Sequence, residues 1–292
     1  MGKVSMTKLY KDEIVEKVKE CLITAASTFS KDKKEAYRRA IEQETVSVAK
    51  WVLENILQNA LVAEQNRSPL CDDTGIPHLF LEVGPNQSVN GQLISLIHEG
   101  VCEGLRALPG RSMAVNGSDL QRIDQSGGLN PDSGALLPTP ILLKPITENM
   151  LRLHVLMHGG GPEIRAKTFR IFHKHKVSIV TDEIIDWAVE GAGLLGCSPV
   201  TLAIGIGRSH FEASSLMMDA MVYGNYDIQS EIETEITERV NQSKKGALGL
   251  GGQNTALGSF LRIGPQRASG VRIVSLRPCC CFEPRKASVI LM

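Results

Sequence analysis

The first 66 residues of the chain are patterned for long helices, and the residues that follow are not. Residues 8–28 and 33–64 carry apolar side chains at helical spacing and contain few glycines or prolines, which predicts a helix over each stretch. The segment Asn66-Arg67-Ser68-Pro69 stops the second stretch, because proline cannot continue a helix. We therefore predict a helical lead-in over residues 1–66, followed by a mixed α/β region over residues 67–292.

Beyond residue 70, strand-like and helix-like segments alternate. Apolar runs predict strands at residues 79–84, 141–144, 151–157, 200–207, 257–263 and 271–276. Helical spacing predicts helices at residues 92–107, 179–194, 211–222 and 228–243. A chain of 292 residues is long enough for one large domain or two small ones, and we predict a single α+β domain over residues 1–292 with one mixed sheet. Residues 108–140, rich in Gly, Pro, Asn, Asp and Ser, are too long for an ordinary connection, so we expect a functional loop there.

Charge and cysteine content exclude several classes of protein. Lys+Arg and Asp+Glu are both 32, which argues against a general role in nucleic-acid binding. The N-terminus is charged throughout, without the apolar core of a signal peptide, and no run of about 18 apolar residues is present to span a membrane. Seven cysteines, an odd number, then indicate a reducing compartment, and we predict a cytoplasmic protein.

Three well-separated cysteines each lie beside glycine, proline or turn residues. They occur in Cys71-Asp72-Asp73-Thr74-Gly75, in Gly196-Cys197-Ser198-Pro199 and in Cys281-Phe282-Glu283-Pro284-Arg285. Thiolates converging from three such segments would hold an iron–sulfur cluster and leave one iron open as a Lewis acid. Isolated cysteines are more often small core residues, which is how we interpret Cys21 and Cys102, and spacing alone leaves both interpretations open for the trio.

The run Cys279-Cys280-Cys281 offers more thiols than one centre can use. Neighbouring side chains diverge along an extended chain, so at most one of the three is a plausible ligand. A possible metal pair, His173-Lys174-His175, is flanked by cations that repel a metal, and we interpret it as a solvated surface turn.

Two further motifs indicate hydrolases, but each is incomplete. Asp73-Thr74-Gly75 is the active-site triplet of aspartic proteases, which need two copies or a short dimerising chain; this long chain has one, after a helical start. His158-Gly159-Gly160-Gly161 resembles the oxyanion-hole segment of lipases, but the chain contains no Gly-x-Ser-x-Gly nucleophile elbow. The triple glycine is then either a loop whose bare N–H groups face an anion or a plain tight turn.

Five segments in a shared order resemble one family: the α subunit, or N-terminal domain, of class I iron–sulfur fumarases and L(+)-tartrate dehydratases. The segments are Asn66 to Gly75, Gly159-Gly160-Gly161-Pro162-Glu163, Gly196-Cys197-Ser198-Pro199 with Gly205-Ile206-Gly207, Gly249 to Thr255, and Cys281 with Arg285-Lys286. The resemblance implies a 4Fe–4S cluster on Cys71, Cys197 and Cys281, whose fourth iron binds the substrate. It also implies a hydro-lyase acting on a small hydroxy-dicarboxylate, tartrate, malate or a relative.

The same resemblance assigns roles to the residues around that cluster. Asp73 is expected to handle the substrate hydroxyl or a proton, Arg111 to bind a carboxylate with its fork of donors, and Gly159, Gly160 and Gly161 to bind substrate. Asp72 stands where the family usually has Gln, and an ionised Asp would repel a substrate carboxylate. Either Asp72 is protonated or the substrate presents a donor, such as a hydroxyl group, at that point.

The chain contains nothing that corresponds to the family's second, smaller β domain. We therefore expect a separate β subunit that supplies the catalytic base, in a dimer of αβ pairs. Extra residues before Cys281 leave Cys279 as an alternative ligand, and histidines that the family carries before its last strand are missing from residues 264–270. The competing interpretation is a non-enzymatic module that binds or senses an iron–sulfur cluster.

Overall fold

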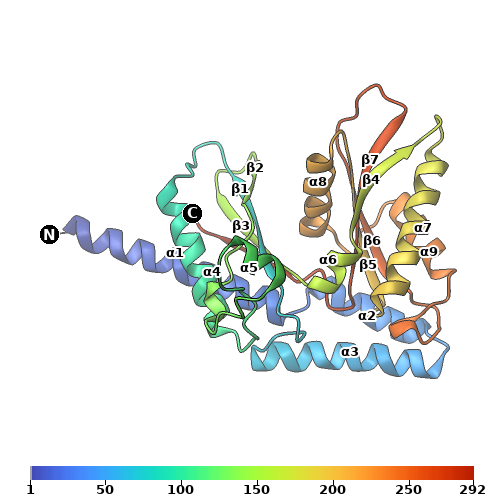
Figure 1. The fold of residues 1–292 in the computed structure, drawn as a ribbon, viewed down its shortest axis with the longest axis horizontal. Coiled ribbons are helices and arrows are strands. Elements are labelled where there is room, and N and C mark those ends of the chain that lie inside the picture. Colours follow the sequence, from blue (N-terminus) through green and yellow to red (C-terminus); the bar gives the residue numbers. More distant parts are fainter. Residues whose placement is uncertain (1) are drawn as a thin grey trace. The chain divides into compact units, whose positions relative to one another are not determined.

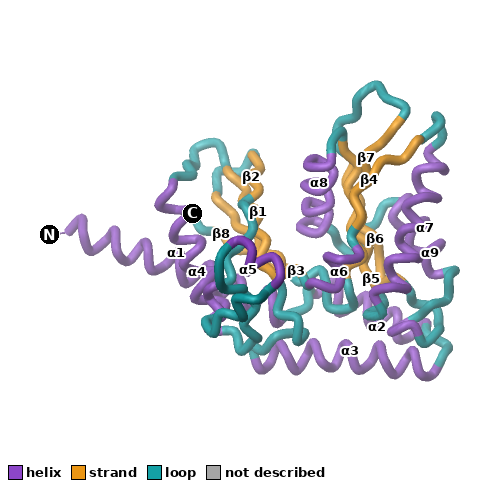
Figure 2. The backbone as a smooth tube through the Cα atoms, viewed as in Figure 1, coloured by secondary structure: helices purple, strands orange, loops and turns teal. Residues whose placement is uncertain are grey.

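The computed structural model describes residues 2–292, with side chains from residue 10 onward, so Met1 of the predicted lead-in lies outside the described residues. The chain forms two compact units. Unit 1 comprises the chain up to Thr28, Leu61–His158 and Arg285–Met292, and unit 2 comprises Phe29–Ala60 and Gly159–Pro284. Helices and strands are both abundant (Figure 2), which confirms the α+β class. The single domain over residues 1–292 stays a prediction.

Unit 1 is a mixed four-stranded sheet packed against two helices (Figure 1). The strand order is β2-β1-β3-β8, with β2 parallel to β1 and the other pairs antiparallel. The elements are α1 (Gly2–Ser27), β1 (Ile76–Val83), α4 (Gly91–Ala107), β2 (Leu142–Pro145), β3 (Leu151–His158) and β8 (Lys286–Ile290). At Gly100 the two helices touch, because a Cβ there would lie 2.6 Å from Cβ of Val18. Leu22, Ile97 and Leu153 belong to the core that helices and sheet share.

Unit 2 has a four-stranded sheet with helices on both faces: α7 and α9 lie on one side and α8 on the other (Figure 1). The strand order is β4-β7-β5-β6, with only the β5–β6 pair parallel. The elements are α2 (Lys31–Gln43), α6 (Gly160–Arg165), β4 (Lys167–Phe172), α7 (Val177–Leu195), β5 (Val200–Gly207), α8 (His210–Tyr223), α9 (Glu231–Asn241), β6 (Ala256–Ile263) and β7 (Val271–Cys279). All eight residues of β5 are buried, as expected for a strand covered on both faces. Gly205 lets α8 approach, because a Cβ there would meet the Ala213 carbonyl oxygen at 2.0 Å.

The structure corrects two parts of the sequence prediction. Residues 33–64 do not form one helix: α2 ends at Gln43, and α3 (Ser47–Asn66) begins after a break. The carboxylate of Glu44 accepts hydrogen bonds from the N–H groups of Thr45 (2.9 Å) and Val46 (3.0 Å), which turns the chain at that point. The predicted single mixed sheet is two sheets, because strands β4 and β8 were not recognised in the sequence.

The long segment 108–140 is mostly irregular, as predicted (Figure 2). It contains a short helix α5 (Asp119–Asp124) and a 3-10 turn at Ser133–Ala135. An ion pair between Arg106 at the end of α4 and Asp132, with Nη2 and Oδ2 2.8 Å apart, fixes its far end to unit 1. None of the described helices is both long and apolar enough to cross a membrane.

Candidate active site

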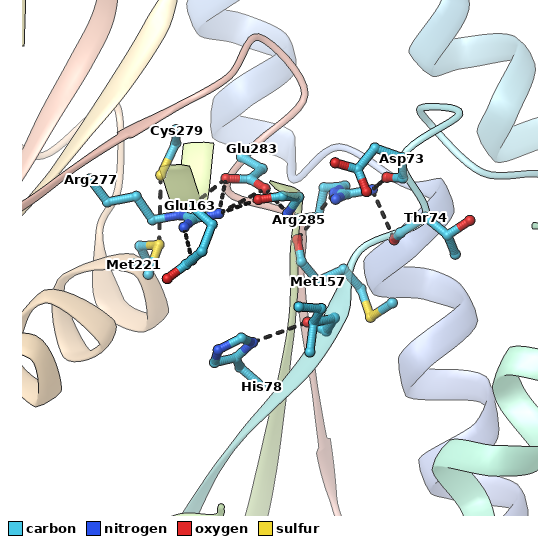
Figure 3. A network of polar contacts seen from close by, with 12 residues as sticks. Asp73, Thr74, His78, Met157, Glu163, Met221, Arg277, Cys279, Glu283 and Arg285 are labelled. Carbon is cyan, nitrogen blue, oxygen red and sulfur yellow. Dashed lines mark hydrogen bonds and ion pairs between the residues drawn. The ribbon is translucent and has the colours of Figure 1, made fainter. Parts of the chain in front are cut away.

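The Cys71 loop in unit 1 is held from below by a buried arginine. Arg285 is 2% exposed, and its Nη1 donates to the carbonyl oxygens of Asp73 (2.7 Å) and Thr74 (3.0 Å), while its Nε donates to the carbonyl oxygen of Met157 (3.1 Å; Figure 3). A guanidinium stays charged at all relevant pH values and offers donors in a fixed fork. The backbone that carries Asp73 is therefore set by a rigid group from the end of the chain.

Gly75 is the residue that lets Arg285 reach this position. Its φ is +92°, in the region that favours glycine. A Cβ at Gly75 would lie 2.6 Å from Arg285 Nη2 and 3.0 Å from the carbonyl oxygen of His158. The glycine of the Cys71-Asp72-Asp73-Thr74-Gly75 segment is thus required by packing as well as by backbone conformation.

A cavity of about 220 Å³ lies beside the Cys71 loop within unit 1. It is lined by Pro69, Cys71, Asp72, Thr74, Pro109, Gly110 and Arg111. Arg111 Nη1 lies 3.4 Å from Asp72 Oδ2, and the two side chains are 54% and 89% exposed. The Arg111 backbone N–H donates to Thr74 Oγ1 at 3.2 Å. The structure thus brings Cys71, Asp72 and Arg111 to one cavity, although Arg111 is far away in sequence.

Two histidines that the sequence analysis did not assign lie in unit 1 close to these segments. The rings of His78 on β1 and His158 on β3 are stacked, with centroids 3.9 Å apart and planes inclined by 24°. The available signal was position: His78 follows Gly75 by three residues, and His158 directly precedes the triple glycine.

In unit 2, the two other predicted cluster segments are joined by their backbones. The Cys281 N–H donates to the Cys197 carbonyl oxygen at 2.8 Å. Cys197 is exposed and follows the left-handed residue Gly196 at the end of α7, whereas Cys281 is buried. A hydrogen bond with the Cys280 thiol, together with burial, raises the pKa of Cys281, and the nearby Cys197 thiol adds to the rise. Cys279 and Cys280 are also buried.

A buried charge network in unit 2 fixes the start of the triple glycine (Figure 3). Arg277 and Glu283 are 0% and 1% exposed, with Arg277 Nη2 3.1 Å from Glu283 Oε2. Glu283 also accepts the Gly159 N–H, and Arg277 Nη2 donates to the Gly159 carbonyl oxygen at 3.1 Å. Glu163 completes the network through Arg277. The expected anion facing a glycine N–H is therefore a carboxylate of the chain itself, at Gly159, while Gly160 and Gly161 begin α6.

Helix α2 holds the Cys281 turn from its other side. Lys33 Nζ donates to the Glu283 carbonyl oxygen at 2.7 Å, and the Tyr37 hydroxyl donates to the Cys281 carbonyl oxygen at 2.6 Å. Burial lowers the pKa of Lys33 to about 8, although the thiols of Cys280 and Cys281 oppose this shift. Sequence analysis missed Lys33, Tyr37, Arg277 and Glu283, because each acts through a partner remote in sequence.

The predicted site residues therefore fall into two groups. Unit 1 contains Cys71, Asp72, Asp73 and Arg111, and unit 2 contains Gly159–Gly161, Cys197 and Cys281. Over residues 2–292, no group of three or more His, Cys, Asp or Glu side chains is arranged to hold a metal ion, since neither unit alone contains all three predicted thiols. All three are free thiols, so their donor chemistry fits iron. One correction concerns His173, predicted to be solvated: it is buried, while its neighbour His175 is exposed.

Comparison with known proteins identifies the family. The model of the fumarate hydratase (Fumerase) family matches residues 15–290. The chain belongs to the fumarate hydratase family. A putative L(+)-tartrate dehydratase subunit alpha from Methanocaldococcus jannaschii is 28% identical over 282 residues, covering 93% of each chain. L(+)-tartrate dehydratase subunit alpha from Escherichia coli strain K12 is 25% identical over 247 residues, covering 82% of this chain and 78% of the relative.

These findings confirm the resemblance that the five segments indicated. This member of the fumarate hydratase family is a hydro-lyase of the fumarate hydratase and tartrate dehydratase type. The roles of the individual site residues stay predictions.

Proposed function

We propose that the chain is the α subunit of an iron–sulfur hydro-lyase that reversibly removes water from a small hydroxy-dicarboxylate such as tartrate or malate. Family membership and relatives named as alpha subunits support the proposal. The observation that carries it is the hydrogen bond between Cys281 and Cys197, because it joins two candidate ligand segments that are remote in sequence.

Cys71, Cys197 and Cys281 would hold a 4Fe–4S cluster, which would supply an iron that acts as a Lewis acid on the leaving hydroxyl group. Cysteine binds iron as thiolate, so loading releases protons from the three thiols. The raised pKa of Cys281 means that its thiol is protonated before the metal binds. Cys279 and Cys280 are the alternative ligands in the same turn, and both are less accessible than Cys197.

Arg111 and Asp73 would bind and orient the substrate in the cavity beside Cys71. Arg111 offers paired donors to one carboxylate of a dicarboxylate. Its present partner, Asp72, is highly exposed, and exposed ion pairs contribute only about 0–1 kcal/mol. A substrate carboxylate therefore competes with Asp72 at little cost. Asp73, held by its carbonyl oxygen on Arg285, would accept the substrate hydroxyl proton.

Asp72 would select the substrate. An ionised carboxylate next to the bound dicarboxylate repels it unless the substrate donates a hydrogen bond there. A second hydroxyl group, as in tartrate, is such a donor, whereas fumarate has none. We therefore propose a preference for tartrate-like substrates over fumarate.

A separate β subunit would supply the catalytic base, in a dimer of αβ pairs. Two relatives that cover most of this chain are named as alpha subunits, which supports the existence of a partner. Under this proposal the chain alone binds the cluster but is inactive.

Anaerobic reconstitution tests the proposal directly. The chain, loaded with iron and sulfide and mixed with its β partner, should dehydrate at least one acid in a set of tartrate, malate and related hydroxy-dicarboxylates. Cys197→Ser should lose iron and activity, whereas Cys102→Ser, which removes a half-buried thiol of α4, should keep both. Full iron content and activity in Cys197→Ser would show that Cys197 is not a ligand. Cluster binding without activity for any acid, with the partner present, would favour the sensing module.

A further inference from the structure

Unit 2 contains a second cavity of about 220 Å³, which the proposed dehydration does not use. It is lined by His173, His175, Lys176, Val177, Val180, Thr181, Ile184, Ile206, Ile232, Ile236, Leu261, Ile263, Gln266 and Arg272. These residues come from α7, α9, strands β5–β7 and the adjoining turns. Its floor is aliphatic, and Ile184, Ile236 and Leu261 are buried there.

The mouth of the cavity is cationic. Lys176 and His175 are exposed at one side, and Arg272 is half-buried at another. Among the described lining residues none is Asp or Glu. An apolar floor beneath a cationic mouth matches a ligand with an aliphatic body and a single negative charge.

The turn that presents these cations is held in a strained conformation. Lys174 and His175 have φ values of +46° and +58°, a conformation that is uncommon for residues other than glycine. Buried His173 maintains it: its Nδ1 accepts the His175 N–H (2.9 Å), so its Nε2 donates to the Ser269 carbonyl oxygen (2.7 Å). Strain of this kind costs about 1–3 kcal/mol per residue and is concentrated at ligand-binding sites.

The start of α7 adds a second electrostatic feature to the same mouth. Lys176 occupies the N-cap position without a side-chain cap, and the first turn contains no acidic residue. A helix N-terminus favours an anion and disfavours a cation. An anion bound beside Lys176 would interact favourably with both the side chain and the helix.

We infer that this cavity binds a small aliphatic monocarboxylate, with its chain on the floor and its carboxylate between Lys176 and Arg272. The volume lies between the cavity of about 150 Å³ that accepts benzene and the lower limit of about 300 Å³ for drug-sized ligands. It suits an acid of about five to eight carbons. A dicarboxylate substrate does not fit, because its second charge would be buried on an aliphatic floor.

Calorimetric titration of the full chain with hexanoate tests this inference. We expect saturable binding that is about tenfold or more tighter than that of hexanamide, which lacks the charge, or of succinate, which lacks the aliphatic end. Absence of saturable binding for every straight-chain acid from butanoate to octanoate, up to about 10 mM, would overturn the inference. Equal binding of hexanoate and hexanamide would also overturn it.

Two variants and a matched control locate the ligand. Lys176→Gln should weaken hexanoate binding by about fivefold, and Ile232→Phe, at a half-buried lining position, should weaken it further by filling the floor. Lys174→Gln removes the same charge from an exposed position of the same turn that does not line the cavity, and it should bind like the parent. If Lys174→Gln and Lys176→Gln weaken binding equally, or Ile232→Phe binds unchanged, the ligand is not in this cavity.

The same titration, repeated with the β partner present, separates a ligand site from a subunit contact. Hexanoate binding that persists in the complex supports the inference, and binding that disappears contradicts it. No dehydration assay enters these tests, so their result is independent of the proposed function.

Discussion

At the scale of single residues, Arg285 determines how the Cys71 loop is presented. It donates to three carbonyl oxygens, those of Met157, Asp73 and Thr74. Arg285→Met should lower the free energy of unfolding by about 3 kcal/mol, because buried carbonyl groups would lose their donor. Urea unfolding measures this, and Arg267→Met, at an exposed position, is the control. Arg285→Lys should recover only part of the loss, because an ammonium lacks the fork; full recovery would contradict a role for the fork.

Asp72 is the residue that we expect to decide between substrates. Asp72→Gln removes a charge next to the proposed dicarboxylate site and provides an amide donor. The ratio of kcat/KM for malate or fumarate to that for tartrate should rise about tenfold, since a lost or gained polar contact in a binding site is worth 1–3 kcal/mol or about this factor. Steady-state kinetics of the reconstituted complex provides the ratio. An unchanged ratio would remove Asp72 from substrate selection, without affecting the cluster assignment.

Individual site residues were accessible from the sequence to different degrees. Cys71, Asp72 and Arg111 were named in advance, and the structure brings them to one cavity. Arg277 was not, because an arginine on a strand ordinarily faces solvent; only the fold shows that Glu283 neutralises it at 0% exposure. Pairings between remote residues depend on the completed sheet, so no local pattern indicates them.

At the scale of elements, Glu44 sets the boundary between α2 and α3 and ties it to the glycine-rich segment near the C-terminus. Besides Thr45 and Val46, its carboxylate accepts the Gln253 N–H (2.8 Å) and the Asn254 side-chain amide (3.0 Å). Burial acts to raise the pKa of Glu44, but the hydrogen bonds from Val46, Asn254, Gln253 and Thr45 outweigh it and hold the pKa below the ordinary value of 4.5.

A pKa lower in the folded than in the unfolded state means that Glu44 stabilises the fold above pH 4.5, and that this contribution is lost as the pH falls through the folded-state pKa. Glu44→Gln should therefore reduce the free energy of unfolding at pH 7 by about 2 kcal/mol. The difference from the parent should shrink in acid. Urea unfolding at several pH values measures both. Glu42→Gln, an exposed position in the same helix, should show neither effect; a pH-independent difference for Glu44→Gln would contradict the charge argument.

The elements themselves were predictable where their pattern was strong. The apolar run of β5 and the helical spacing of α4 and α7 gave the correct type and nearly the correct ends. Strand β4 was missed because five of its six residues are exposed or half-buried, so they show no alternation. The break at Glu44 was missed because a carboxylate that binds its neighbouring N–H groups has no distinctive residue pattern in a charged helix.

At the scale of the whole molecule, the chain passes between the two units at four peptide bonds, after Thr28, Ala60, His158 and Pro284. Composition and length allowed one or two domains, but segment order alone does not show that a unit is assembled from separate stretches of chain. The proposed ligands are divided in the same way, with Cys71 in unit 1 and Cys197 and Cys281 in unit 2.

Because those ligands come from both units, cluster loading should slow hydrogen exchange in both. Binding energy of a metal centre appears as stability of the parts that supply its ligands. Comparison of the loaded and metal-free chain by hydrogen exchange should show protection near α4 in unit 1 and near α7 in unit 2. Cys71→Ser should reduce protection in both units. Protection confined to unit 2 in the parent chain would exclude Cys71 as a ligand.

The turn Glu283-Pro284-Arg285 contains two anchors only two residues apart: Glu283 accepts the Gly159 N–H, and Arg285 donates to the Asp73 and Thr74 carbonyl oxygens. Inserting a residue here would shift one anchor against the other. In evolutionary terms, the spacing from Cys281 to Arg285 should stay constant among descendants of this chain. Their differences in length should accumulate instead in surface connections such as residues 264–270.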